Sequence, residues 1–326
     1  MTRTYVFNGD ADGLCALQQL RLAEPAGPAA TADVLVTGVK RDIALVARAG
    51  CGDGDACVVL DISLDTNRAG LLALLDAGVN VRYFDHHFAG EVPAHPGLDA
   101  HIDPSPSVCT SLLVDRSLDG RFRRWAITGV FGDSLLEEGR ALAQDAGLTA
   151  EATERLRELG VAVNYNAYGE TIADLHVPPV DLAHEMLPYA DPLDFAARSA
   201  AFERLADGFR QDMDLARRLE PARQAAGALL FVLPDEAWAR RASGTLANDL
   251  ARAHGTCAIA IVSPKSGGDY LVSVRVPRDC TVSAESFCRT FPTGGGRRSA
   301  AGINHLPAGE LARFSAAFED QFRNHA

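Results

Sequence analysis

The segment Asn8-Gly9-Asp10-Ala11-Asp12-Gly13 is the first group of residues whose types and spacing could do chemistry. In an extended chain alternate residues project to one side, so Asn8, Asp10 and Asp12 can converge on one point. Two carboxylates and an amide oxygen placed in this way suit a hard divalent cation such as Mg²⁺ or Mn²⁺. They also suit a turn in which Asp12 stabilises the start of the next helix. The segment alone leaves both interpretations open.

Three more polar groups follow apolar runs later in the chain. Asp61 follows the run 56–60, Asp85-His86-His87 follows 79–84, and Asp133 follows the helix-like run 125–131. Neutral imidazole is a good ligand for Mn²⁺ or Zn²⁺, so the histidine pair extends the set of candidate metal ligands.

The first 85 residues must position these groups, and they alternate between strand and helix patterns. Strands are expected at 4–8, 33–39, 56–60 and 79–84, and helices at 14–22, 43–49 and 66–77. Repeated strand–helix units of this length predict an α/β fold with a parallel sheet. Ligands bind at the carboxyl ends of such strands, where Asn8, Asp61 and Asp85 are expected. Four carboxylates gathered there would repel each other without cations, so the pattern predicts a two-metal centre suited to attack on phosphorus.

The rest of the chain is predicted to hold a helical region and a second, smaller α/β domain. A charged amphipathic stretch, 194–224, predicts a connecting helix. Beyond it, strands are expected at 228–233, 257–262 and 270–276, and helices at 243–253 and 308–322. We therefore expect a metal-binding catalytic domain at 1–190, a helical linker at 191–225 and a substrate-binding domain at 226–326. The active site is expected in a cleft between the two domains.

A glycine-rich segment near the C-terminus is the candidate substrate-binding loop. Its members are Gly294, Gly295, Gly296, Arg297 and Arg298. Glycines let backbone N–H groups approach an anion closely, and arginines bind phosphate in a bidentate fork. A surface loop with solvated arginines is the alternative. The segment 164–168 (Asn-Tyr-Asn-Ala-Tyr) could likewise stack on a base or pack at a helix end.

The composition is that of a globular protein, and its charge narrows the choice of partners. The chain has 326 residues, of which 47% are hydrophobic, and a net charge of −12. This balance is opposite to that of proteins that hold long duplex nucleic acid. No apolar run approaches the length of a membrane span, and no secretory signal is visible. The odd number of cysteines, seven, favours reduced thiols, so a cytoplasmic location is expected.

Taken in order, these motifs resemble those of the DHH phosphoesterase superfamily. The segment 8–13, Asp61, Asp85-His86-His87 and Gly132-Asp133 resemble its four motifs, and the segment 294–302 resembles the GGGH-x-x-A-A-G motif of the DHH-associated domain. The resemblance covers the whole chain. It implies that Asp10 binds a first cation, Asp12 a second, and that Asp61 bridges them. His86 and Asp133 would complete the second site.

The resemblance also assigns supporting roles and shows two departures. Asp85 would bind a cation or orient a histidine or the reacting water, and His87 would support the site or contact the scissile phosphate. The family usually has His where this sequence has Asn8 and Arg297. At Asn8 the first cation would therefore lose an imidazole and gain a weaker amide oxygen or a water.

The implied protein is a hydrolase that cleaves phosphoesters with water activated by two divalent cations, Mn²⁺ before Mg²⁺. Its expected substrates are short oligonucleotides, pAp-like molecules or cyclic dinucleotides. A RecJ-like single-strand exonuclease and a catalytically weakened nucleotide-binding protein are the alternatives. A homodimer is compatible with the sequence, and no membrane partner is expected.

Overall fold

The computed structural model describes residues 2–25 and 33–323 of the chain. The chain forms two compact units, Met1–Phe209 and Arg210–Ala326. Their division lies inside the segment 191–225, for which the sequence predicts a linker. Each unit has a hydrophobic core of its own, as expected for units of this size.

The first unit is built on a five-stranded sheet with the strand order β2-β1-β3-β4-β5. Its strands are β1 (Arg3–Phe7), β2 (Val34–Val36), β3 (Ala56–Leu60), β4 (Asn80–Asp85) and β5 (Leu98–Ile102). Every pairing is parallel, which confirms the predicted parallel sheet and brings the carboxyl ends of all five strands to one edge. Strand β5 was not predicted, because its half-exposed sequence LDAHI lacks the apolar run of a buried strand.

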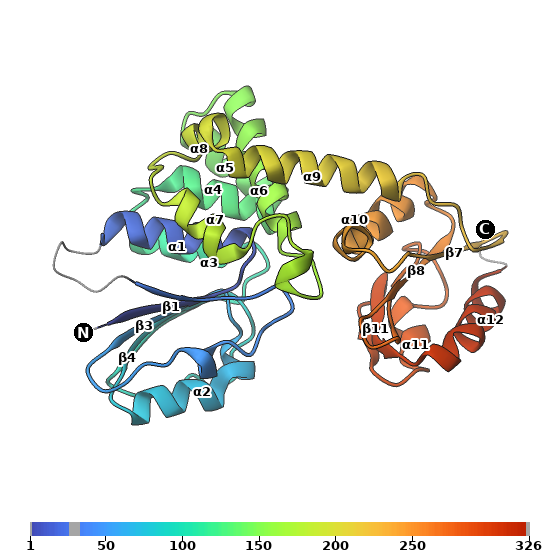
Figure 1. The fold of residues 1–326 in the computed structure, drawn as a ribbon, viewed down its shortest axis with the longest axis horizontal. Helices are drawn as coiled ribbons and strands as arrows, with labels where there is room; N and C mark the ends of the chain where they lie inside the picture. The colour runs from blue at the N-terminus through green and yellow to red at the C-terminus, as the bar shows by residue number, and fades with distance from the viewer. Residues whose placement is uncertain (1, 26–32, 324–326) are drawn as a thin grey trace. The chain divides into compact units, whose positions relative to one another are not determined.

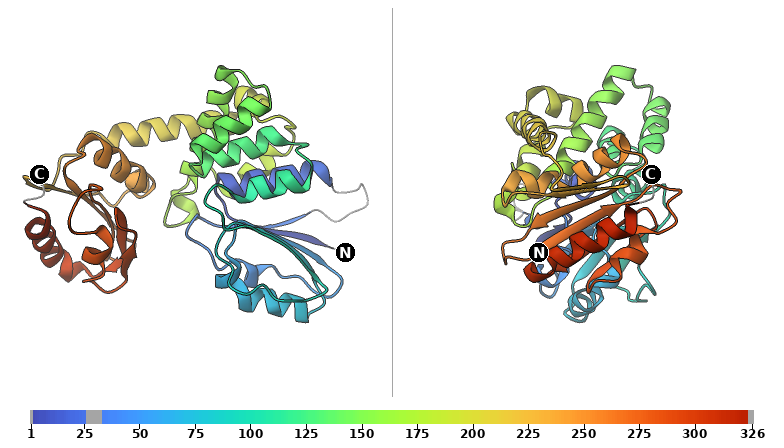
Figure 2. Two further views of the ribbon diagram at one scale, coloured as in Figure 1. Left: turned by 180° about the vertical axis from the view of Figure 1, so that it is seen from behind. Right: turned by 90° about the vertical axis from the view of Figure 1, so that its right-hand side faces the viewer.

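Both faces of this sheet are covered (Figure 1). Tyr5 and Phe7 belong to the larger core, whereas Val6 between them belongs to the smaller one, as the alternation of side chains along a strand requires. Most helices pack on the first face: α1 (Ala11–Ala23), α3 (Thr110–Ser117), α4 (Arg123–Gly132), α6 (Ala150–Asn166) and α7 (Pro179–Met186). Helix α2 (Leu64–Asp76) and the 3₁₀ turn η1 (Val46–Arg48) cover the second face, and α2 lies on the opposite side of the sheet from α1 in the left view of Figure 2.

Two helical predictions for this part of the chain are wrong. The expected helix at 43–49 is reduced to the turn η1. The expected connecting helix is two helices, α8 (Pro192–Arg198) and α9 (Ala200–Ala216), followed by strand β6 (Arg223–Ala225). The break lies at Ser199, whose backbone is extended and whose hydroxyl accepts a hydrogen bond from the N–H of Ala201 at 3.1 Å. A serine that caps a new helix ends the preceding one. Helix α5 (Leu136–Asp145) and the turn η2 (Ile172–Asp174) complete the unit.

The second unit is a mixed six-stranded sheet with the order β10-β11-β9-β8-β7-β6. It contains β7 (Ala228–Val232), β8 (Ala258–Pro264), β9 (Tyr270–Arg275), β10 (Gly294–Gly296) and β11 (Ala300–Leu306), with helices α10 (Ala237–Ala253), α11 (Ala284–Cys288) and α12 (Leu311–Phe322) and the turn η3 (Ala308–Glu310). The expected smaller α/β domain is therefore confirmed. The glycine-rich segment is not the predicted loop, because β10 and β11 pair as an antiparallel hairpin. No helix within the described residues is long and apolar enough to cross a membrane.

Candidate metal centre

Glycines let the first motif fold tightly at the end of β1. Asn8 follows the strand, Asp10 is the N-cap of α1 and Asp12 lies in its first turn. A Cβ atom on Gly13 would lie 2.2 Å from the carbonyl oxygen of Asn8, and one on Gly9 would lie 2.2 Å from that of Gly38. Since real Cβ atoms never approach so closely, only glycine allows helix α1 and the loop after β2 to come this near to the motif.

Asp10 is held by its own helix and by a lysine that the sequence analysis did not single out. Its Oδ1 accepts hydrogen bonds from the N–H groups of Asp12 (3.0 Å) and Gly13 (3.2 Å). Its Oδ2 accepts a hydrogen bond from Lys40 Nζ, in the loop after β2. Burial raises the pKa of Asp10, but Lys40 outweighs it and leaves this pKa below its usual range. Burial likewise lowers the pKa of Lys40, and the charge of Asp10 reverses that effect, so the ammonium is stabilised.

Asp12 lies at the N-terminus of helix α3. Its Oδ1 accepts the N–H of Ser111 and its Oδ2 that of Thr110, each at 2.7 Å. Cys109, the N-cap residue of α3, makes no side-chain cap. The carboxylate of Asp12 therefore caps a helix that starts about a hundred residues later, and the helix dipole stabilises its negative charge.

Asp61, at the end of β3, lies near Asp10 and Asp12 and also near His86. It is 3% exposed, and its φ of +58° places a non-glycine residue in the left-handed region. Its Oδ1 lies 3.3 Å from His86 Nε2 and accepts a hydrogen bond from the Thr110 hydroxyl at 3.4 Å. Burial, followed by the charges of Asp10 and Asp12, raises the pKa of Asp61 well above its usual range. A carboxyl group in this setting stays ionised readily only beside an added positive charge.

His86 faces three carboxylates. Its Nδ1 lies 3.0 Å from the carbonyl oxygen of Val108, so Nδ1 carries the proton and donates it. Its Nε2 lies 3.3 Å from Asp61 and 4.0 Å from both Asp12 and Asp133. Burial lowers the pKa of His86, but its hydrogen bond with Asp61 and the nearby negative charges raise it to about 10. A histidine anchored by Nδ1 with Nε2 turned toward carboxylates is the usual arrangement of a metal-binding imidazole.

Asp133 reaches the cluster from the end of helix α4. Burial, and then the charge of Asp12, raises its pKa to about 7. The preceding Gly132 allows this approach, because a Cβ atom there would lie 2.3 Å from that of Ala11 in α1.

Asp85 is fully buried, and both of its carboxylate oxygens have partners. Its Oδ1 accepts the backbone N–H of His87 (3.2 Å) and lies 2.6 Å from His87 Nδ1, and its Oδ2 accepts the N–H of Leu64 at 3.3 Å. Both oxygens are used in this way, so Asp85 orients His87. The side chain of His87 is 44% exposed. Ligand atoms of Asp61, His86 and His87 nevertheless lie within 4.8 Å of one another.

The donor set fits a divalent cation. Asp12, Asp61, His86 and Asp133 offer carboxylate oxygens and one imidazole nitrogen, which Mn²⁺ accepts together. The Oδ1 atom of Asn8 is buried and has no hydrogen-bond partner among the described residues. A buried acceptor of this kind is usually satisfied by water or an ion. Asn8, Asp10 and Asp61 could contribute to a first site, where Lys40 also lies.

In the glycine-rich hairpin of the second unit, the backbone geometry explains why Gly294 and Gly296 are glycines. A Cβ atom on Gly294 would lie 1.8 Å from the carbonyl oxygen of Cys288, and Gly296 has a φ of +143°. Gly295 has open space around it. Arg298 donates a hydrogen bond to the carbonyl of Cys280 at 3.0 Å. Arg297 is exposed, and its side chain makes no hydrogen bond or ion pair in the described part of the chain.

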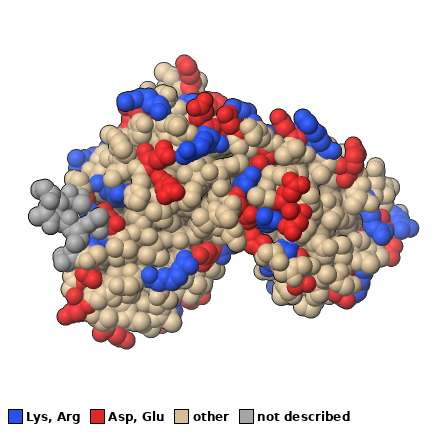
Figure 3. Space-filling view, in the orientation of Figure 1, with Lys and Arg blue, Asp and Glu red and all other residues tan. Residues whose placement is uncertain are grey.

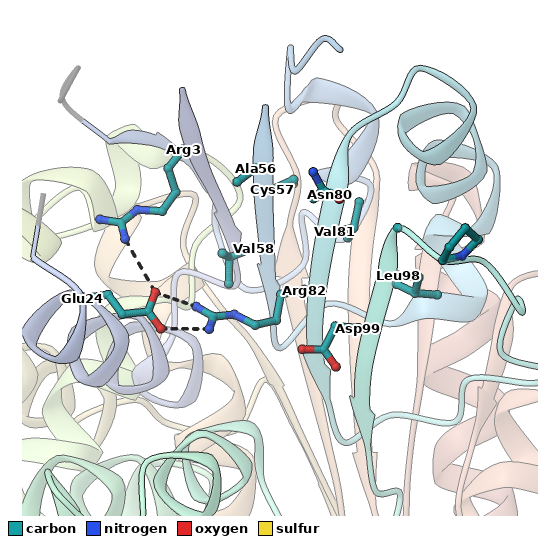
Figure 4. A pocket seen from close by; sticks show the side chains of 12 residues that line it. Arg3, Glu24, Ala56, Cys57, Val58, Asn80, Val81, Arg82, Leu98 and Asp99 are labelled. Carbon is teal, nitrogen blue, oxygen red and sulfur yellow. Dashed lines mark hydrogen bonds and ion pairs between the residues drawn. The ribbon is translucent and has the colours of Figure 1, made fainter. Parts of the chain in front are cut away.

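A separate pocket lies at the opposite, amino-terminal ends of the strands (Figure 4). Ala56 and Asn80, the first residues of β3 and β4, line it. Of its two arginines, Arg82 pairs with Glu24, and Arg3 pairs with Asp33 and more distantly with Glu24. Their charges are already compensated, so this pocket offers less for a charged ligand than the edge with the carboxylates.

Sequence reasoning missed Lys40, Thr110 and Ser111. Thr110 and Ser111 contact Asp12 through their backbone N–H groups, which almost every residue type has, so the sequence does not reveal this role. Lys40 did leave a signal, because Lys40 and Lys265 are the only lysines of the sequence, and arginine supplies all its other permanently charged basic side chains.

Comparison with solved structures confirms the fold. Exonuclease RecJ bound to manganese is 19% identical, with a TM-score of 0.60 over 98% of this chain and 89% of that one. RecJ from Thermus thermophilus is 20% identical, with a TM-score of 0.62 over 98% of this chain, which spans about half (51%) of that protein. The pGpG-specific phosphodiesterase PggH from Vibrio cholerae is 13% identical, with a TM-score of 0.57 over the full length of both chains. No family model and no curated protein matches the sequence. The chain therefore shares the fold of these RecJ and PggH structures.

Proposed function

We propose that this protein is a divalent-metal-dependent phosphoesterase that hydrolyses a bond in a small nucleotide. The observation that carries the proposal is the group Asp12, Asp61, His86 and Asp133 at the carboxyl edge of the sheet. Helix α3 accounts for the buried carboxylate of Asp12, but Asp61 is buried beside it and faces Asp10 and Asp12, which costs stability unless a cation compensates the charge. The shared fold with RecJ and PggH, named as an exonuclease and a phosphodiesterase, supports the same chemistry.

The residues of the centre have separable roles in this proposal. Asp12, Asp61, His86 and Asp133 would hold the cation, and a first cation of the kind the sequence predicts would rely on Asn8, Asp10 and Asp61. A bound cation would supply charge stabilisation at phosphorus and a more acidic water. Asp85 fixes the His87 ring by its Nδ1, so the rest of this half-exposed ring is available to a phosphate oxygen.

A short substrate fits the surface better than a long strand. The net charge is −12, and acidic and basic side chains are interspersed on the face shown in Figure 3. A long strand is held by a continuous basic groove. PggH, whose substrate is a dinucleotide by its name, matches over its whole length, whereas the T. thermophilus RecJ chain is about twice as long. Phe88, which follows His87, is 75% exposed and could stack on a base.

The test is turnover of a nucleotide panel with Mn²⁺, Mg²⁺ or excess chelator. The panel holds a linear dinucleotide, a cyclic dinucleotide, pAp, a five-residue RNA and a 30-residue single-stranded DNA. We expect that one of the short substrates is hydrolysed and that chelator abolishes this hydrolysis. Mn²⁺ should support it at least as well as Mg²⁺, because His86 supplies a nitrogen ligand. Asp61→Asn is the control for contaminating nuclease.

Each other outcome contradicts the proposal in a defined way. Full activity in chelator would exclude a metal-dependent reaction. Preferential degradation of the 30-residue DNA would favour a RecJ-like exonuclease. Binding of a nucleotide without turnover in any metal would favour the weakened nucleotide-binding protein.

A further inference from the structure

Lys40 places an ammonium group among the candidate metal ligands. Of the carboxylates of Asp10, Asp12, Asp61 and Asp133, only that of Asp10 pairs with a lysine or arginine within the described residues, and the partner is Lys40. The lysine comes from the loop after β2, at the same edge of the sheet as the other site residues.

Three contacts from the end of helix α6 and the residues after it fix this side chain and its backbone. Lys40 Nζ donates a hydrogen bond to Asn164 Oδ1 at 3.0 Å and lies 5.6 Å from the ring centroid of Tyr168. The backbone N–H of Lys40 donates to the carbonyl of Ala167 at 2.9 Å. Holding a long side chain in one rotamer costs entropy, which these contacts offset. Asn164 and Tyr168, candidates for binding a base, therefore position a lysine.

The ammonium competes with the first cation for its ligands. The sequence resemblance assigns Asp10 to that cation, yet Asp10 Oδ1 already accepts two N–H groups and its Oδ2 accepts Lys40. Of the three residues proposed for the first cation, Asn8 offers an amide oxygen, which binds cations more weakly than imidazole. A fixed ammonium beside a divalent ion would also repel it at the low effective dielectric of a buried site.

We infer that the Lys40 ammonium takes the place of the first divalent cation, so that the centre binds one cation, held by Asp12, Asp61, His86 and Asp133. This inference rests on the proposed function and refines its metal requirement. Lysine suits the role because its charge is compact, whereas the planar guanidinium of arginine, used almost everywhere else in this chain, is not. Two of the three N–H groups of Lys40 bind Asp10 and Asn164, and the third is left for a substrate phosphoryl oxygen.

The test is the number of Mn²⁺ ions bound per chain, measured by metal analysis after equilibrium dialysis and by electron paramagnetic resonance. Four proteins are compared: the wild type, Lys40→Met, the double variant Asn8→His/Lys40→Met, and Lys265→Met as the matched lysine control. We expect one Mn²⁺ with the spectrum of an isolated ion in the wild type and in Lys265→Met. The double variant should bind two ions with a spin-coupled spectrum, while Lys40→Met keeps at least one.

The outcomes separate this inference from the proposed function. Two coupled ions in the wild type would overturn the inference and leave the phosphoesterase proposal standing. A double variant that is folded by circular dichroism but binds one ion would also overturn the inference, because Lys40 would then not be what excludes the second ion. A wild type that binds no Mn²⁺ would contradict the proposed function itself.

Discussion

The strand-end cluster of the first unit and the glycine-rich hairpin of the second are both dense sequence motifs, but they are built differently. In the cluster, Asp61 is buried beside other carboxylates, and its backbone is in the left-handed region. Both features lower the stability of the fold. In the hairpin, Gly294 and Gly296 are required by the fold itself. A motif that the fold does not need is stronger evidence for function than one that it does.

The largest effect that tests this contrast is expected at Asp61. Asp61→Asn should lower turnover with Mn²⁺ by about 3–4 kcal/mol of transition-state stabilisation, roughly a hundredfold to a thousandfold. Asparagine is the right replacement because it tolerates the left-handed backbone that Ala would strain. The metal-free variant should also be more stable than the metal-free wild type, since a buried carboxyl is removed.

Steady-state kinetics and urea unfolding in chelator measure both quantities on the same samples. A variant that keeps half of its activity, or that loses stability along with activity, would show that Asp61 supports the fold and not the chemistry.

The next effect is expected at the two arginines of the hairpin, which differ in their contacts. Arg297 is exposed without a partner, so Arg297→Ala should raise KM about tenfold to a hundredfold while kcat changes little, if it grips a phosphate that does not react. The increase should shrink at high salt. Arg298→Ala, which removes a hydrogen bond to Cys280, should instead cost about 1 kcal/mol of stability. A collapse of kcat in Arg297→Ala would contradict this division.

A smaller effect is expected at two adjacent glycines. Gly294→Ala places its Cβ atom against the carbonyl of Cys288 and should destabilise the protein by about 1–3 kcal/mol. Gly295→Ala meets open space and should change the unfolding free energy by less than about 0.5 kcal/mol. The unfolding free energies of the two variants are compared by urea titration, monitored with a spectroscopic signal from the second unit. Equal losses would show that the steric explanation of this hairpin is wrong, and an unstrained Gly295→Ala that loses substrate affinity would place an anion there.

The last effect is a pH dependence of the metal-free protein. The folded pKa of Asp133 is raised to about 7, so the stability that its protonated form contributes is full below pH 4 and is lost as pH rises through 7. His86, with a pKa raised to about 10, loses its contribution between about pH 6.5 and 10. Thermal unfolding in chelator should therefore show lower stability at pH 8.5 than at pH 6.

Mn²⁺ should reverse this order, because metal binding requires deprotonated ligands. The control is Asp133→Asn, which should flatten the metal-free profile between pH 4 and 7. A metal-free protein that is more stable at pH 8.5 would contradict the assignment.

The sequence predicts that the strand-end side chains gather, because a parallel sheet brings the ends of its strands to one edge, wherever they lie in the chain; their role as ligands stays a prediction. Asp61 and His86 were found in this way, and they lie 3.3 Å apart. Lys40 was missed because the rarity of lysine is its only signal in the sequence, and its partners, Asn164 and Tyr168, are more than a hundred residues away. The hairpin was predicted as a loop because glycine is rare in strands, whereas here the strand pairing depends on it.

The most direct test of the central claim is the position of bound metal in a crystal. Crystals grown with Mn²⁺ should show an anomalous peak at the manganese absorption edge within bonding distance of His86 Nε2 and the carboxylates of Asp12, Asp61 and Asp133, and no such peak should appear in crystals of Asp61→Asn. Saturating Mn²⁺ with no peak beside His86 would contradict the account.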